Sequence, residues 1–335
     1  MRLENLLALT NARAINDPFV KDFNNIVFEA NKVKRGDLFV AFDEKTIQTA
    51  IYNGAYGIMF DKPTQISDRE IAWIKVENIE DALRRLIRFR LIEKDVTVYE
   101  CNEIILKLSL QVMCETNFIS LDGDIRSITK RLWDIENFTT ILFSPLVTPR
   151  DIFTDVKAMP NSLGEKITVM EQTLFETSFI YDDVFYERQL IPPFFIPYLE
   201  ELLNLFKILK INFRLKKFTP IEHFEAVFTN KKFEIKEFGT SDKVLIFEKN
   251  CSLVKQEIVY LQRQATWAKT IFLIPFSHAD NFENIDNLIV YKNKNEIINI
   301  LKDNSFHFAL IVGVDKSILS KPLANQAQMT LFDFK

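Results

Sequence analysis

Glycine is scarce in this sequence, which contains 7 glycines among 335 residues. Loops that bind phosphate groups need glycine, because their backbone must approach the phosphate closely and adopt positive φ angles. A chain with so little glycine has few positions at which such a loop could form.

Cysteine and histidine are also rare, with three residues of each. The cysteines, Cys101, Cys114 and Cys251, stand far apart without CxxC spacing, and the histidines are equally scattered. A structural zinc site gathers four such ligands, which usually occur in closely spaced pairs. We therefore expect no metal site.

Long apolar runs are absent as well. No window approaches about 18 uncharged apolar residues, and the apolar part of the N-terminal stretch contains Glu4. These features predict neither a membrane span nor a signal peptide, so we expect a cytoplasmic protein without a membrane partner.

The chain carries no excess of positive charge. Its formal net charge is −4 and its pI is about 5.7. A negative chain has no general electrostatic attraction to nucleic acid or anionic lipid. We therefore expect no direct binding of nucleic acid.

Apolar residues are plentiful at 47%, and the length suits two or three domains rather than one core. In residues 1–95, apolar patterns predict a small α/β domain. Its expected strands are 25–30, 37–42, 56–60 and 71–76, and its expected helices are 45–53 and 79–93.

The middle region, 96–237, has a mixed pattern. The expected strands are 97–101, 117–121 and 139–144. One expected helix ends near 113, and a second covers 125–135. Two further apolar runs lie around 166–181. Pro192 and Pro193 precede another helical segment.

Strands and helices alternate cleanly in residues 238–316. The expected strands are 243–248, 270–275, 287–291 and 307–314, with helices at 252–267 and 294–302. This alternation is typical of a parallel sheet with helical crossovers, as in Rossmann-like domains. Residues 317–335 lie outside the pattern and are expected to form a tail.

Three stretches in the N-terminal part form a recognisable set: KVKRGDLFVAF (32–42), AIYNGAYGIMFDK (50–62) and IAWIKVENIEDALRRLIRF (71–89). With the turn at 34–37, the pair Gly54-Ala55 and the step from Glu77 to Leu83, this set resembles the N-terminal domain of the Mur ligases of peptidoglycan synthesis. The layout is most similar to that of the members that add D-alanyl-D-alanine.

The resemblance implies an α/β, Mur-ligase-like multidomain fold. In that family, the N-terminal domain binds the UDP end of the substrate, a central domain binds ATP, and a Rossmann-like domain receives the incoming amino acid or dipeptide. The short length implies that the central domain, 96–237, is reduced here.

The phosphate loop of such a ligase, GxxGK[ST], uses glycines, a lysine and a hydroxyl that meets Mg²⁺. The best position for it is Ser120–Ile125, between an expected strand and helix. Gly123 is retained there, but Asp124 replaces the lysine and Ile125 replaces the hydroxyl. A carboxylate would repel a triphosphate. Gly164 near Lys166 also lacks the motif, so we expect no usable phosphate loop, no catalytic residue and no cofactor.

Other positions that the resemblance implies have lost their ligands too. Residues 29–31 (Glu-Ala-Asn) and 43–45 (Asp-Glu-Lys) replace the residues expected to bind uridine diphosphate. Residues 248–251 (Glu-Lys-Asn-Cys) replace an acidic, asparagine-rich turn in the C-terminal domain.

A few residues could support other chemistry. His223 lies in an expected strand and shows no partner that would make it a base. The acidic group Asp182, Asp183 and Glu187 is expected to be a solvated loop, and Cys251 a helix-start residue. The aromatic segment 192–198 is expected to be an exposed patch, either a seam between domains or a partner surface.

The stretch QMTLF in the tail resembles the pentapeptide, commonly Q-L-[SD]-L-F, by which bacterial polymerases and repair proteins bind the DNA sliding clamp. The resemblance implies that Gln328 bonds at a pocket rim, Met329 replaces the usual leucine, and Leu331 and Phe332 fill an apolar pocket. The alternative is a tail that folds back onto its own sheet.

Our leading hypothesis is a non-catalytic, Mur-ligase-like protein that acts through partner binding, with its tail docking on the sliding clamp. The alternative is a ligase that adds D-alanyl-D-alanine to a UDP-muropeptide using ATP and Mg²⁺ at an atypical site. A third hypothesis is a scaffold that bridges wall synthesis and replication or division.

Overall fold

The computed structural model describes residues 1–319, except 63, 116, 162–166, 242 and 283–284. The chain divides into two compact units, which we name unit 1 (1–106 and 114–160) and unit 2 (107–113 and 161–335). The predicted domain boundaries at 95 and 237 fall inside these units and stay predictions.

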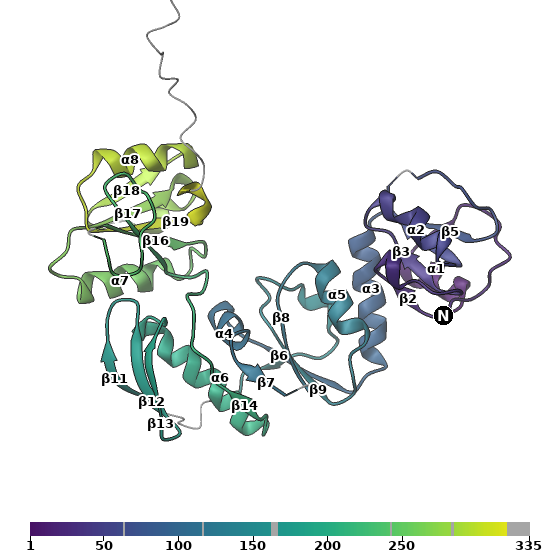
Figure 1. The fold of residues 1–335 in the computed structure, drawn as a ribbon, viewed down its shortest axis with the longest axis horizontal. Helices are drawn as coiled ribbons and strands as arrows, with labels where there is room; N and C mark the ends of the chain where they lie inside the picture. The colour runs from purple at the N-terminus through teal and green to yellow at the C-terminus, as the bar shows by residue number, and fades with distance from the viewer. Residues whose placement is uncertain (63, 116, 162–166, 242, 283–284, 320–335) are drawn as a thin grey trace, which may run out of the picture. The chain divides into compact units, whose positions relative to one another are not determined.

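Unit 1 begins with a five-stranded sheet of order β1-β5-β4-β3-β2. Strands β2 to β5 are parallel and β1 is antiparallel to β5. The strands are β1 (Arg13–Ala14), β2 (Ile26–Val27), β3 (Leu38–Val40), β4 (Gly57–Phe60) and β5 (Ala72–Lys75), and the helices are α1 (Leu3–Thr10), α2 (Ile47–Tyr52) and α3 (Ile79–Ile92). Figure 1 shows these elements together at the N-terminal end of the chain.

Helix α3 forms where the sequence predicts it. Asn78 caps its first turn by accepting hydrogen bonds from the backbone N–H groups of Glu80 and Asp81, at 2.7 and 3.2 Å. Leu83 and Leu86 belong to the apolar stripe that the helix buries.

A second sheet of unit 1 is fully parallel and has the order β10-β6-β9-β8. Its strands are β6 (Val96–Glu100), β8 (Phe118–Leu121), β9 (Thr139–Phe143) and β10 (Lys157–Ala158), with helices α4 (Glu103–Ser109) and α5 (Ile125–Trp133). Leu86 of α3 and Ile128 of α5 share one buried cluster with Ile141 of β9. The two sheets of unit 1 therefore share a core.

Unit 2 begins with an antiparallel sheet of order β11-β12-β13. It comprises β11 (Thr168–Gln172), β12 (Thr177–Tyr181) and β13 (Val184–Gln189), followed by α6 (Ile196–Ile208); β7 (Met113–Cys114) pairs with β14 (Phe213–Arg214). Asp182 and Asp183 form the turn between β12 and β13, with φ angles of 49° and 59°. Both are exposed, as the solvated-loop interpretation predicts, but Glu187, the third member of the acidic group, is an exposed residue of β13 and not of a loop.

The last sheet of unit 2 has the order β15-β16-β19-β17-β18. The strands are β15 (Glu225–Thr229), β16 (Lys243–Glu248), β17 (Thr270–Pro275), β18 (Leu288–Tyr291) and β19 (Phe308–Val312), with helices α7 (Val254–Gln264) and α8 (Ile297–Asp303). All are parallel except β15, which is antiparallel to β16. The α/β fold class is confirmed, including a parallel C-terminal sheet with crossover helices (Figure 1).

The aromatic segment 192–198 is not the exposed patch that the sequence predicts. Phe195 is completely buried. The ring of Phe194 packs against those of Phe224 and Tyr260, with centroids 4.9 and 4.6 Å away. The prediction of an exposed patch was wrong, because these partners come from distant parts of the sequence. The alternative of a seam fits the contact between Phe194 and Tyr260, which lie on opposite sides of the expected boundary at 237.

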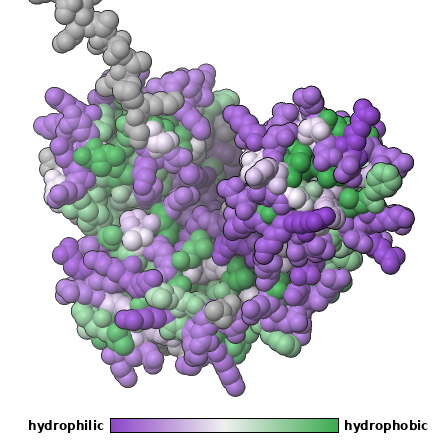
Figure 2. Space-filling model, turned by 45° about the vertical axis from the view of Figure 1, so that its right-hand side comes forward, coloured by the Kyte–Doolittle hydropathy of each residue, from purple (hydrophilic) through white to green (hydrophobic). Residues whose placement is uncertain are grey.

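Hydrophilic residues cover most of the face shown in Figure 2, and apolar residues appear there in scattered groups. Scattered apolar residues are normal on a protein surface. Among the described residues, no helix combines the length and the apolar character needed to cross a membrane.

Candidate functional site

The carboxyl edge of the second sheet in unit 1 is the place where a parallel sheet usually binds ligands. Two strand-turn-helix steps meet this edge. The first, from β6 to α4, turns through Cys101 and Asn102, and the second, from β8 to α5, turns through residues 122–124. The second is the predicted phosphate-loop position.

The turn before α5 is closed by its own carboxylate. Asp124 is the N-cap residue of α5, and its Oδ1 accepts a hydrogen bond from the backbone N–H of Ser127 at 2.8 Å. Hydrogen bonds from the side chain and backbone of Ser127 hold the pKa of Asp124 below its ordinary value. A helix N-terminus attracts anions, and here that position holds an ionised carboxylate.

Gly123 makes this turn possible, because its φ angle of +117° is one that side-chain-bearing residues rarely adopt. Ile125 is buried at the start of α5 and contributes to the core. At the degenerate loop, Gly123 therefore shapes the turn, Asp124 caps α5 and Ile125 packs in the core.

The basic side chains of α5 engage other partners. The guanidinium of Arg126 lies 5.0 Å from the ring centroid of Phe42, and its Nε lies 3.7 Å from Oε1 of Glu80. The Nζ of Lys130 lies 5.8 Å from the centroid of the same ring. Neither residue stands at the position after Gly123, where a phosphate loop has its lysine.

The step from β6 to α4 is a second candidate that the sequence analysis did not consider. Asn102 Oδ1 accepts a hydrogen bond from the backbone N–H of Ile104 at 2.7 Å. No glycine or lysine occurs at residues 101–103. The expected strand at 97–101 followed by a helical run was a signal that could have revealed this turn. The predicted stretch around Gly164 and Lys166 includes residues 162–166, which lie outside the described residues.

The predicted uridine-diphosphate positions bond within their own loops. Glu29 pairs with Lys32 at 3.0 Å, and the hydrogen bond and charge of this lysine lower the pKa of Glu29. Asp43 accepts a hydrogen bond from the backbone N–H of Lys45 at 3.1 Å. In the nearby turn, Oδ2 of the buried Asp37 accepts from the backbone N–H of Lys34 at 2.9 Å.

In unit 2, Glu248 ends β16 and is completely buried. Its carboxylate accepts hydrogen bonds from the backbone N–H groups of Phe224 at 3.0 Å and Asn250 at 2.6 Å. Its Oε1 lies 2.9 Å from Nδ1 of His223, which is also buried. The prediction that His223 belongs to a strand and has no positioned partner was wrong, because β15 begins at Glu225 and the partner is a distant carboxylate.

Glu257 of α7 adds a second buried carboxyl group beside this pair. Burial raises its pKa well above the ordinary value, and the nearby Glu248 carboxylate raises it further. Burial also raises the pKa of Cys251, which opposes activation of this thiol by the helix. Within the described parts of the chain, no group of three or more His, Cys, Asp or Glu residues is placed to hold a metal ion.

The predicted partner-binding residues Gln328, Met329, Leu331 and Phe332 lie outside the described residues.

Comparison with known proteins gives similarity in structure only. No family model matches the chain, and no curated protein matches it. A MurF ligase from Thermotoga maritima, solved in complex with ADP, aligns with 88% of this chain and 94% of its own, at 12% identity and a TM-score of 0.46.

A MurF from Acinetobacter baumannii aligns with 93% of this chain and 95% of its own, at 10% identity and a TM-score of 0.49. The similarity concerns the fold. Both structures belong to the family that residues 32–89 resemble in sequence.

Proposed function

We propose that this protein is a non-catalytic, Mur-ligase-like protein that acts by binding a partner. The observation that carries the proposal is the cap of α5, where the Asp124 carboxylate holds the backbone N–H of Ser127. This carboxylate bonds at the helix N-terminus that a strand-turn-helix phosphate site would use.

The electrostatic cost of placing a phosphate there supports the proposal. Two unit charges 4 Å apart repel by about 1 kcal/mol in water and by about 4 kcal/mol at an effective dielectric of about 20. A triphosphate carries several negative charges, and Asp124 is exposed enough for solvent to screen part of the repulsion. A repulsion of only about 1 kcal/mol already lowers the affinity for the nucleotide several-fold for each phosphate charge nearby.

The tail supplies the proposed means of partner binding. Burial of two large apolar side chains such as Leu331 and Phe332 contributes roughly 3–6 kcal/mol before the cost of ordering the segment. Micromolar affinity is the natural outcome, and it suits recruitment to an abundant ring such as the bacterial DNA sliding clamp.

The test is a direct binding measurement between the purified chain and a bacterial sliding clamp. Three forms are compared: the full chain, a form that lacks residues 326–335, and the double variant Leu331→Ala, Phe332→Ala. We expect micromolar binding by the full chain alone. Equal binding by all three forms, or binding by none, would remove docking of the tail on the clamp from the proposal.

A further inference from the structure

Unit 2 contains a cavity of about 930 Å³ at the amino ends of β16 and β19. It opens to solvent and is bounded by the turn from β11 to β12, the loop at 238–241, the end of α7 and the start of β19. Glu248 lies at the opposite, carboxyl end of β16, so the cavity is separate from the edge where such sheets usually bind ligands. Pockets of this size hold small molecules.

A continuous series of aromatic rings lines the cavity. Successive ring centroids lie 4.7, 6.0, 6.2 and 5.8 Å apart along the series Phe238, Phe228, Phe175, Phe308 and Trp267. The three middle rings are buried, whereas Phe238 and Trp267, at the two ends, are 41% and 71% exposed. Two large aromatic side chains thus stand open to solvent at the cavity.

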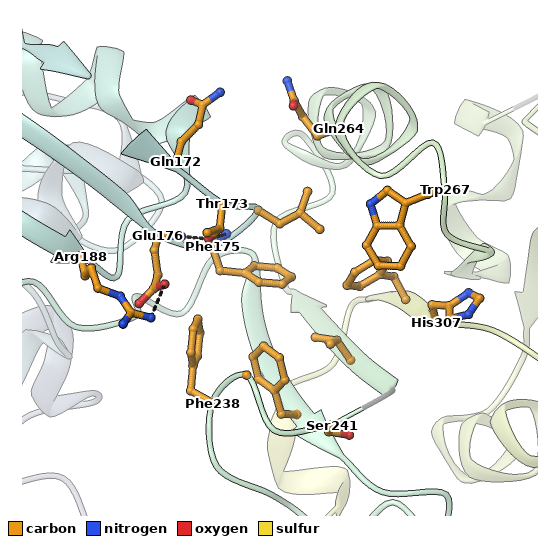
Figure 3. A pocket seen from close by; sticks show the side chains of 15 residues that line it. Gln172, Thr173, Phe175, Glu176, Arg188, Phe238, Ser241, Gln264, Trp267 and His307 are labelled. Atoms are coloured by element: carbon orange, nitrogen blue, oxygen red, sulfur yellow. Dashed lines mark hydrogen bonds and ion pairs between the residues drawn. The ribbon is translucent and has the colours of Figure 1, made fainter. Parts of the chain in front are cut away.

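Polar groups surround these rings from several elements. In Figure 3, Gln172 and Gln264 lie on one side of the aromatic residues with their amide ends directed away from the rings, and Ser241 lies on the other side. Each glutamine amide offers both a donor and an acceptor, whereas the Ser241 hydroxyl already donates to the Thr229 carbonyl and accepts from the Lys243 backbone N–H. The polar groups left for a ligand are therefore the two glutamine amides at the rim, which offer donors and acceptors to the edge of a heterocycle.

The charged residues of the lining already satisfy each other. Arg188 Nη2 lies 3.4 Å from Oε2 of Glu176. Arg188 sits at an irregularity in the pairing of β12 and β13 and has a φ angle of +45°, and its backbone N–H donates to the Ser178 hydroxyl at 3.0 Å. Such irregularities often re-aim a side chain.

Because the two charges form a pair, an ionic ligand would have to disrupt that pair to use either one. His307 Nδ1 accepts a hydrogen bond from the backbone N–H of Lys269 at 2.9 Å, which leaves Nε2 as the protonated nitrogen of the neutral ring. The remaining lining favours an uncharged, planar ligand.

We propose that this cavity binds a neutral, planar heteroaromatic molecule of the nucleobase or nucleoside class, which stacks on one of the two exposed rings, Phe238 or Trp267, and bonds to a glutamine at the rim, Gln172 or Gln264. The inference does not depend on the proposed partner binding. It adds a small-molecule site in unit 2 to a protein whose degenerate phosphate loop lies in unit 1.

The test is calorimetric titration of the full chain with adenosine, guanosine, cytidine and uridine. Dihydrouridine is the matched control ligand, because it keeps the hydrogen-bonding edge of uridine but has a saturated, puckered ring. We expect saturable binding of at least one nucleoside, and, if uridine binds, weaker binding of dihydrouridine. At least one of the variants Phe238→Ala and Trp267→Ala, the one that removes the stacking ring, should weaken binding about tenfold, the typical effect of removing a stacking partner.

Phe276→Ala is the matched control variant, because Phe276 is 66% exposed in the same unit but does not line the cavity. It should bind as the unmodified protein does. Thermal unfolding of each variant verifies that it is folded. The proposal is overturned if no nucleoside binds saturably at millimolar concentration, or if both cavity variants bind as tightly as Phe276→Ala.

Discussion

Asp124 caps α5, and single substitutions can distinguish this capping role from the effect of its negative charge. Its side chain caps α5 through one hydrogen bond to the Ser127 backbone. We expect Asp124→Ala to lower the free energy of unfolding by about 1 kcal/mol, the usual effect of losing an N-cap. Asp124→Asn keeps a capping oxygen and should lose much less. Urea denaturation measures both, and equal losses for the two variants would contradict the assigned cap.

The buried carboxyl group of Glu257 should make unit 2 sensitive to pH. Its pKa in the folded protein lies well above the ordinary value of 4.5. The folded protein therefore keeps this proton after the unfolded chain has released it. Its stabilising contribution is complete below pH 4.5 and falls as the pH rises toward the folded pKa.

Glu257→Gln removes this titration while keeping the shape of the side chain. As the pH rises from about 5 to about 8, the free energy of unfolding of unit 2 should fall less in this variant than in the unmodified protein. Urea denaturation with a probe in unit 2 measures it. Glu237→Gln, at an exposed position, is the control and should keep the original pH dependence. Parallel pH profiles for all three proteins would show that Glu257 does not carry the effect.

At the residue scale, sequence reasoning succeeds where an interaction is local. The cap that Asp124 makes can be inferred from the sequence, because its partner, Ser127, is three positions away; that the loop binds no phosphate stays a prediction. The group formed by His223, Glu248 and Glu257 could not be predicted, because burial of each carboxylate depends on strands and helices that fold together from separate segments.

For secondary structure elements too, features that depend on neighbouring residues could be predicted and those that depend on distant residues could not. Helix α3 could be predicted because its cap and apolar stripe lie within one segment. Strand β13 was missed because it is mostly exposed and shows no apolar alternation. Phe194 and Phe195 were assigned to the surface because their partners, among them Phe224 and Tyr260, are distant in sequence.

Strand β4 provides a test of packing at the element scale. A Cβ atom added at Gly57 would lie 2.6 Å from Cε1 of Phe23 and 3.0 Å from Cδ1 of Leu38. We expect Gly57→Ala to destabilise the protein by about 1–3 kcal/mol, as overpacking usually does. The measurement is the free energy of unfolding in urea.

A double variant identifies the cause of that loss. Phe23→Leu shortens the side chain that collides with the new methyl group. Gly57→Ala should therefore cost less in the Phe23→Leu background than in the unmodified protein. Additive effects of the two substitutions would exclude the collision with Phe23.

For the whole molecule, the apolar pattern predicted an α/β chain of two or three domains, and the boundaries proposed at 95 and 237 stay predictions. The predicted boundary at residue 95 follows α3, yet Leu83 and Leu86 of this helix share a core with Ile128 and Ile141. Contacts of this kind are made in three dimensions, so a break in the sequence pattern does not reveal them.

The two units have separate buried clusters, which predicts local effects of mutation. The cluster around Leu86 and Ile74 contains unit 1 residues, and the cluster around Leu245 and Ile311 contains unit 2 residues. Gly57→Ala should speed amide hydrogen exchange at Ile74 and leave Leu245 unchanged. Equal acceleration at both sites would mean that the chain opens as one cooperative body.

At the scale of the whole molecule, the central claim is that the loop between β8 and α5 does not bind a nucleotide. The most direct measurement is calorimetric titration of the full chain with Mg-ATP. We predict no saturable binding of millimolar Mg-ATP by a chain that also carries Phe238→Ala and Trp267→Ala, because these substitutions remove the nucleoside site proposed in unit 2 from the measurement. Saturable binding, with ATP consumed when a UDP-muropeptide and D-alanyl-D-alanine are added, would contradict the account and favour the ligase alternative.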